Sequence, residues 1–311
     1  MPSTVEVPIY FLAFDHRVSL TQGLLGVTSA LEPADRAWIE SAKLLVLDAL
    51  SMAVSRGVAR EAAAFLVDEE FGSKAARTAR ARGITLAMPV EQSGKAELAL
   101  EYGAAYAEHI DRFRPDYVKV LLRRNPDGSP EVHTRENGLL RSIERSVRDR
   151  PSKWLVELVV PPTGPQLASV ASSQDRFDRE IRADLIVRVI SDLQTAGVEP
   201  DLWKVDGLDD RADCERVAAS VRRDGREHVR CVVLGRAAGM DRVLHWLATA
   251  GSVDGYQGFA VGRTLWWEQL KAMRSQALDR ASAVSQIADN YMRAVVAFEQ
   301  ARTSRRDVAA H

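Results

Sequence analysis

The stretch DREIRADLIVRVISDLQTAGVEPDLWKV, residues 178–205, contains the alternation that decides the fold. Its apolar residues first recur at spacings of three and four, as on one face of a helix, and this pattern ends at Gly197, a residue type common at helix C-termini. A short apolar run, residues 202–205, follows after a turn. The stretch therefore predicts a helix followed by a strand that is buried on both faces.

Similar apolar runs, separated by charged segments of helical period, occur along the whole chain. The eight predicted strands cover residues 9–14, 62–67, 84–90, 117–122, 154–160, 202–205, 229–234 and 256–261. Eight βα repeats favour an α/β fold of the closed (β/α)₈ type, a TIM barrel, over a doubly wound open sheet. The open sheet more often has a glycine-rich phosphate loop after its first strand, whereas the turn here reads FDHRVSLTQG, residues 14–23.

The length of 311 residues suits one such barrel, and we predict a single domain over residues 1–311. Residues 276–303 read as an extra C-terminal amphipathic helix, packed on the outside of the barrel or on a partner subunit. Residues 304–311 are expected to be a frayed tail.

Composition excludes several classes of partner. The 42 Lys and Arg residues almost balance the 43 Asp and Glu residues, so no overall field attracts nucleic acid or a membrane surface. Two cysteines, Cys214 and Cys231, suggest neither a disulfide framework nor a metal site. The N-terminus does not read as a signal peptide, and no apolar stretch approaches the length of a membrane span. We expect a cytoplasmic protein, and a homo-oligomer is left open.

Charged side chains recur at the predicted C-terminal ends of the strands, where barrels carry their active sites. A single such charge is more often a salt-bridge partner, but their convergence on one end suits a small polyanionic substrate. These residues are Asp15, His16, Arg17, Asp68, Glu69, Glu91, Arg123, Arg124, Lys204, Asp206, Arg236 and Arg263.

Lys119 and Glu157 lie inside the apolar runs VKVLL and LVELVV, where a period of two lets each point into the barrel. Two lysines and a carboxylate in apolar surroundings are the ingredients of amine catalysis. A lysine attacks a ketone only when neutral, and both burial and a neighbouring ammonium favour that state, while Glu157 could move the protons. The alternative, that Lys204 and Glu157 form an internal ion pair, stays open at this point.

At these residues the sequence resembles a known family. The segments KVLLRRNP, LVELVVPP, LWKVDGLDD, CVVLGRAAG and GFAVGRTLWW, together with FDHR, VDEEFG and AMPVEQSG, occur in order over roughly residues 9–300. They look like the uncharacterised domain fused to the sugar kinase of inositol catabolism, which is assigned as a 2-deoxy-5-keto-gluconate 6-phosphate aldolase. These 311 residues do not include the kinase portion, and we expect a stand-alone version.

The later repeats are more distantly similar to class I tagatose-bisphosphate aldolases. That resemblance implies a Schiff-base lysine at Lys204, a second lysine at Lys119 and an acid/base glutamate at Glu157. It also implies a phosphate site at Gly262 and Arg263 and at Gly235, although Arg236 stands where the relatives have a small residue.

The mechanism implied is retro-aldol cleavage of a phosphorylated keto-sugar acid, without a cofactor or metal. For 2-deoxy-5-keto-gluconate 6-phosphate the products would be dihydroxyacetone phosphate and malonic semialdehyde. Arg236 and Arg263 are expected to hold the phosphate, and Arg17 or Arg123 the carboxylate, because arginine forks suit both groups. Asp15 joins the expected catalytic set, and Asp68 and Glu91 the expected substrate-binding set.

Two rival hypotheses remain. A metal-dependent barrel lyase would use Asp68, Glu69, Glu91 and His16 as ligands, although no H-x-x-x-H spacing supports a zinc site. A non-catalytic sugar-phosphate-binding protein on the same scaffold is the third possibility, because fold does not fix function.

Overall fold

The computed structural model describes residues 7–309, with side chains through residue 306. Eight parallel strands close into a barrel in the order β1 to β8, and β1 pairs with both β2 and β8. The strands are β1 (Ile9–Phe14), β2 (Ala63–Val67), β3 (Thr85–Pro89), β4 (Tyr117–Arg123), β5 (Lys153–Val159), β6 (Leu202–Asp206), β7 (Arg230–Leu234) and β8 (Tyr256–Val261). The predicted TIM barrel is thus confirmed, and the open sheet was the wrong alternative.

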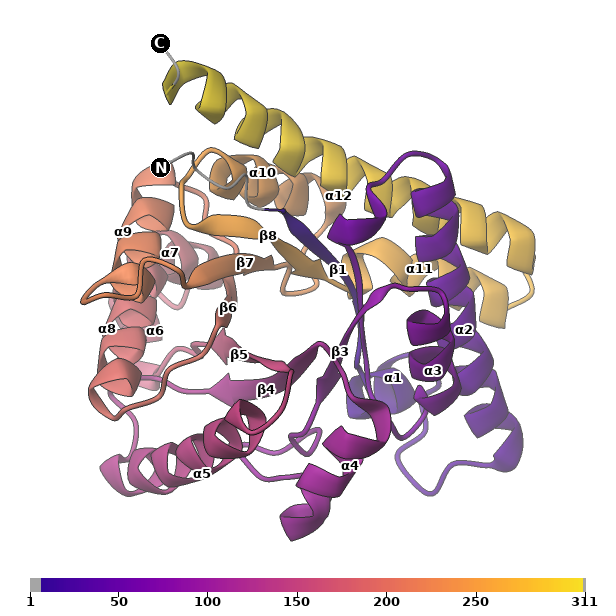
Figure 1. Cartoon of the computed structure of the whole chain (residues 1–311), viewed down its shortest axis with the longest axis horizontal. Coiled ribbons are helices and arrows are strands. Elements are labelled where there is room, and N and C mark those ends of the chain that lie inside the picture. Colours follow the sequence, from indigo (N-terminus) through magenta and orange to yellow (C-terminus); the bar gives the residue numbers. More distant parts are fainter. Residues whose placement is uncertain (1–6, 310–311) are drawn as a thin grey trace.

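Helices surround the ring of strands (Figure 1). One long helix follows each strand: α2 (Pro33–Ser55), α3 (Ser73–Ala81), α4 (Tyr106–Phe113), α5 (Pro130–Arg148), α8 (Arg182–Thr195), α9 (Arg211–Arg222), α10 (Met240–Gly251) and α11 (Arg263–Arg274). Shorter elements lie in the connections: α1 (Val18–Gly23), α6 (Gly164–Ser169), α7 (Gln174–Glu180), η1 (Arg60–Ala62) and η2 (Gly103–Ala105). In the described part of the chain, none of the helices has the length and apolar character that a membrane crossing requires.

The strands alternate between two apolar layers, as their period of two requires. One layer fills the barrel interior with side chains such as Phe11, Leu66 and Leu155. The other packs under the helices and is much larger. Lys119, Glu157 and Lys204 have the interior parity, and their side chains lie in the cavity described below. The prediction that Lys119 and Glu157 point into the barrel is confirmed.

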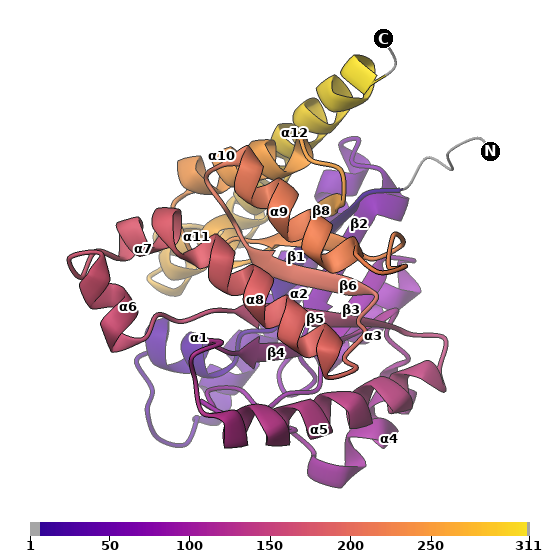
Figure 2. The ribbon, with the colours of Figure 1, turned by 90° about the vertical axis from the view of Figure 1, so that its left-hand side faces the viewer.

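A final helix, α12 (Arg280–Ala309), packs across α10, α2 and α11. Figure 2 shows its last turns extending beyond the other helices. It starts later than predicted because Gln276, in the left-handed region with φ of 62°, ends the preceding helix α11. Residues 304–309 were expected to be frayed, and this prediction was wrong because they continue the helix. Arg305 anchors this part of α12 by donating to the carbonyl of Val253. Residues 310 and 311 lie outside the described range.

Candidate active site

A cavity of about 640 Å³ opens at the C-terminal ends of the strands. Every strand except β2 contributes to its wall, either from within the strand or from the residues that follow it. Its charged lining residues are Asp15, Arg17, Glu91, Lys119, Arg123, Glu157, Arg182, Lys204, Arg236 and Arg263. Most of the predicted site residues therefore share one cavity, with Gly235 and Gly262 in the same wall.

Lys119 is the centre of the charge cluster. It is buried, and its Nζ lies 2.8 Å from a carboxylate oxygen of each of Asp15, Glu91 and Glu157. Burial by itself would lower the pKa of the Lys119 ammonium, but the three carboxylates together raise that pKa well above its ordinary value. Lys119 is therefore fixed in its charged form.

Glu157 joins the two lysines of the site. Its Oε2 lies 2.8 Å from Lys119 Nζ and 3.0 Å from Lys204 Nζ, because Glu157 and Lys204 are direct partners in the β5–β6 register. Burial opposes ionisation of Glu157, but the two lysines outweigh it and lower the pKa of this carboxyl. The pKa of Asp15 is lowered in the same way, chiefly by Lys119 against the effect of burial.

Arg17 is already paired. It donates at 2.7 Å to Glu101 and at 2.7 Å to the backbone carbonyl of Glu91. Its expected role as the carboxylate-binding arginine is therefore less well supported, because a substrate anion would have to replace Glu101.

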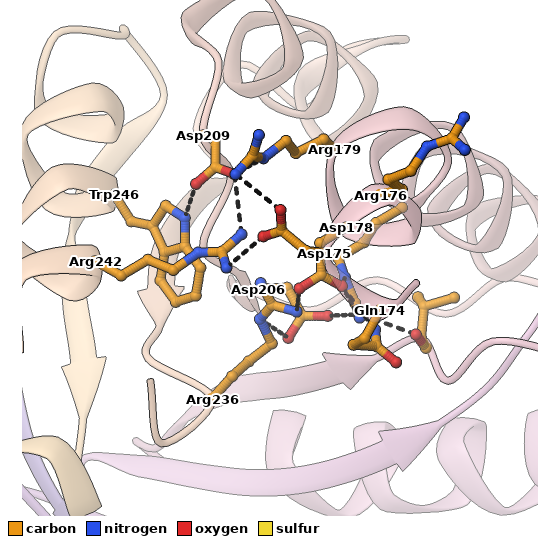
Figure 3. Close-up of polar contacts among 12 residues, drawn as sticks. Gln174, Asp175, Arg176, Asp178, Arg179, Asp206, Asp209, Arg236, Arg242 and Trp246 are labelled. Atoms are coloured by element: carbon orange, nitrogen blue, oxygen red, sulfur yellow. Dashed lines mark hydrogen bonds and ion pairs between the residues drawn. The ribbon is translucent and has the colours of Figure 1, made fainter. Parts of the chain in front are cut away.

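Arg236 is also held by carboxylates, in the cluster drawn in Figure 3. Its Nη1 donates at 2.7 Å to Asp178 on α7, and its guanidinium lies 4.6 Å from the ring centre of Trp246. Asp178 and Asp206 also bind Arg182, which donates to the Val160 carbonyl as well. The cluster ties α7 to the ends of β6 and β7, and it limits the expected role of Arg236 in binding phosphate.

Arg123 and Arg263 differ from these arginines. Among residues 7–309, neither makes an ion pair with a carboxylate, although both line the cavity. Burial lowers the pKa of the Arg263 guanidinium, and the nearby charge of Arg123 acts in the same direction. These two cations remain available for an anion.

The turn after β8 approaches the end of β1 closely at Gly262. A Cβ there would lie 2.4 Å from the carbonyl oxygen of Ala13 and 2.9 Å from the ring of His16. Only glycine fits between these groups. The same approach places Arg263 beside the end of β1.

Burial strips water from His16 and lowers its pKa to about 3, so this ring is neutral near pH 7.

Asp68 does not belong to the cavity, contrary to the expectation that it binds substrate. The turn after β2 directs its fully buried side chain under the helices, where it pairs with Lys43 of α2. Glu69 faces His109 and Arg112.

Two other charged residues that were predicted at the strand ends also form structural ion pairs and do not line the cavity. Arg124 pairs with Glu136 of α5, and Asp206 with Arg182. Asp68 has the same parity as Leu66 in the barrel interior, but it lies beyond the end of β2 and turns away from the cavity. Arg124 follows the cavity-lining Arg123, so its contact with α5 agrees with the period of two.

The ligand set of the metal hypothesis is not assembled. Of its four residues, His16 and Glu91 line the cavity, while Asp68 and Glu69 point elsewhere. Over the range 7–309 there is no group of three or more His, Cys, Asp or Glu side chains arranged to hold a metal ion.

The sequence analysis missed Lys43 and Arg182. Both are charged residues on the buried side of a helix: Lys43 follows Ile39 by one turn and precedes Val46 and Leu47. A charge within an apolar helical stripe is the signal that would have identified them.

Comparison with known proteins identifies a matching sequence family and two solved structures of similar fold. The family model described as "Uncharacterized protein conserved in bacteria (DUF2090)" matches residues 4–302. A search of curated proteins by sequence found no match.

Two solved structures are similar in fold. A fructose-bisphosphate aldolase from Plasmodium falciparum, solved with TRAP and a small-molecule inhibitor, has 14% identity and a TM-score of 0.66, over 94% of this chain and 91% of that one. A structural-genomics target from Corynebacterium glutamicum has 16% identity and a TM-score of 0.56, over 91% of this chain and 85% of that one. At such identities the likeness concerns the fold alone, whereas the family match spans nearly the whole sequence. The chain belongs to the DUF2090 family of bacterial proteins.

Proposed function

We propose that this protein is a Schiff-base aldolase that cleaves a phosphorylated keto-sugar acid, with Lys204 as the attacking amine. The observation that carries the proposal is the unequal environment of two buried lysines. Three carboxylates hold Lys119 as an ammonium, whereas Glu157 is the one carboxylate within 4 Å of Lys204 among residues 7–309. Fewer carboxylates therefore hold the charge of Lys204 than that of Lys119, and this difference supports Lys204 as the nucleophile.

The proposed reaction begins when Lys204 Nζ adds to the substrate ketone. Loss of water from the carbinolamine gives an iminium ion. Glu157 then takes the proton from the hydroxyl on the β carbon, and the electron pair of the breaking carbon–carbon bond moves into the iminium to form an enamine. The aldehyde leaves, the enamine is protonated on carbon, and water releases the ketone product. Lys119 and Asp15 orient Glu157 and the substrate hydroxyls.

The arginines support a substrate with two anionic ends. Arg263, beside Gly262 and Gly235, is proposed to hold the phosphate, and the exposed Arg123 the carboxylate. A phosphate can reach the backbone closely at the two glycines. 2-Deoxy-5-keto-gluconate 6-phosphate, cleaved to dihydroxyacetone phosphate and malonic semialdehyde, fits this description. The motif resemblance and the aldolase-like fold agree with it.

Borohydride trapping tests the proposal. Reduction in the presence of substrate should leave a covalent adduct of the wild-type protein, detected by mass spectrometry. Lys204→Met should abolish both the adduct and turnover, because the electron sink is removed. Lys119→Met should slow turnover yet still permit an adduct. Lys74→Met, a change of an exposed lysine on α3, is the matched control and should behave as the wild type.

An adduct that persists in Lys204→Met but disappears in Lys119→Met would exchange the roles of the two lysines. Turnover without any adduct, together with loss of activity in excess chelator, would favour the metal-dependent alternative. No turnover of any keto-sugar phosphate would favour a binding protein.

A further inference from the structure

A fully buried lysine lies behind the end of β1, outside the cavity. Lys43 of α2 has no exposed surface. Its Nζ donates to the backbone carbonyl oxygens of Phe14 at 2.6 Å and His16 at 3.2 Å, and it pairs with Asp68. The ammonium also lies 4.3 Å from the ring centre of Phe14. The mechanism above uses neither Lys43 nor Asp68.

An ammonium at this place requires a reason. α2 packs against β1 and β2 through an apolar face, and an apolar side chain would fill the position of Lys43 without the desolvation of a charge. Burial lowers the pKa of Lys43, while Asp68 acts against this change. Asp68 is itself fixed by the N–H of Phe71, which donates to it at 2.9 Å.

The two carbonyl groups that Lys43 binds belong to the residues on either side of Asp15. Asp15 in turn places its carboxylate 2.8 Å from Lys119 Nζ. The chain of contacts therefore runs from the turn after β2 through Asp68 and Lys43 to the backbone around Asp15, and from there into the charge cluster. With both flanking carbonyls held, the backbone on each side of Asp15 is fixed.

We propose that Lys43, with Asp68 as its counter-ion, is a positioning residue that aims Asp15 at Lys119. The assignment of a catalytic purpose rests on the proposed aldolase function, but the contact itself does not. This role also explains why a carboxylate at the end of β2 faces away from the cavity.

The structure of the Lys43→Met variant tests the contact without reference to activity. We expect the end of β1 to shift and the Asp15 carboxylate to leave Lys119. An Asp15 that stays in contact with Lys119 overturns the proposal. Because Lys43→Met leaves Asp68 as an unpaired buried charge, the double variant Lys43→Met, Asp68→Asn serves if the single one does not fold.

Kinetics test the consequence for the reaction. Lys43→Met should lower kcat by about 100-fold, the effect of a small misplacement of a catalytic group, with KM changed less than about threefold. The borohydride adduct should still form, because Lys204 is intact. Leu47→Ala, a buried change one turn along the same helix, is the matched control for lost stability and should leave kcat within about threefold of the wild type.

Equal kcat losses in Lys43→Met and Leu47→Ala would overturn the positioning role, because a general loss of stability would then explain both. If the protein turns over no keto-sugar phosphate, the aldolase proposal fails, and the structure of the variant alone still decides whether Lys43 positions Asp15.

Discussion

One oxygen of Glu157 contacts two lysines, and this sharing links the basicity of Glu157 to the state of Lys204. Both lysines lower the pKa of the Glu157 carboxyl in the resting protein. When Lys204 is neutral or part of a carbinolamine, only the Lys119 ammonium faces that carboxyl at close range. Glu157 then binds a proton more readily. The same loss of charge occurs when the iminium becomes the neutral enamine, which is the step in which Glu157 takes the hydroxyl proton.

Removal of the Lys119 ammonium should reverse the response of the site to acid. In the wild type the pKa values of Asp15 and Glu157 are lowered, so their contribution to stability is present above about pH 4 and is lost as the pH falls further. In Lys119→Met these carboxyls lose their main cation, and their pKa values rise above the ordinary range. The folded variant then takes up protons between about pH 7 and about pH 5 and gains stability.

Urea unfolding of both proteins between about pH 7 and about pH 5 measures this effect. The difference in free energy of unfolding between them should narrow by at least about 1.4 kcal/mol, the equivalent of one pKa unit for one group. His16 stays neutral in the folded wild type over this range because its pKa is about 3, and its protonation in the unfolded chain is common to both proteins. A constant difference, as expected for the control Lys74→Met, would contradict the account of the cluster.

At the scale of elements, α12 completes the layer of helices over one side of the barrel. Ile287, Tyr291 and Phe298 are fully buried, and the Tyr291 hydroxyl donates at 2.7 Å to the Tyr10 carbonyl of β1. The helix thus contributes to the core under β1 and β8, far along the chain from both the first strand and the catalytic residues.

Phe298→Ala should therefore lower the free energy of unfolding by about 3–5 kcal/mol, the usual loss for a buried phenylalanine. Val296→Ala on the same helix, where the valine is 49% exposed, should change it by less than about 0.5 kcal/mol. Thermal or denaturant unfolding compares the two variants. Equal effects would mean that α12 does not form part of the core.

The elements were more predictable than the contacts between them. All eight strands fall within one residue of their predicted bounds, because strands buried on both faces read as uninterrupted apolar runs between turn residues. The inward direction of Lys119 and Glu157 was predicted from the period of two and the cost of burying a charge elsewhere, whereas Lys204 was predicted to reach the cavity because it lies near the end of its strand. The partners of Asp68, Arg17 and Arg236 did not, because they come from α2, the β3–α4 connection and α7, whose placement depends on packing.

Across the whole molecule, charge is balanced overall but not locally. The chain carries a formal net charge of −1, so attraction of an anion must come from the cavity itself. Three of the cavity arginines are neutralised by carboxylates: Arg17 by the β3–α4 connection, Arg182 by the end of β6 and Arg236 by α7. Arg123 and Arg263 are therefore the arginines that we propose for binding an anionic substrate, and the charge of Arg123 lowers the pKa of Arg263.

Arg263 and Arg123 are proposed to bind opposite ends of the substrate, the phosphate and the carboxylate, and substitution of each arginine should therefore have a different effect. Arg263→Gln should raise the inhibition constant for inorganic phosphate about 10- to 100-fold, the value of a charged hydrogen bond. Arg123→Gln should leave phosphate inhibition within about threefold, yet raise KM for the keto-sugar acid more than for an analogue that lacks the carboxylate. Arg188→Gln, which removes an exposed arginine paired with Asp127, is the control and should change neither constant. If Arg123→Gln weakens phosphate inhibition and Arg263→Gln does not, the substrate lies in the opposite direction. The ketone must still reach Lys204 in either direction, so the borohydride adduct would persist and only the assignment of the two ends would change.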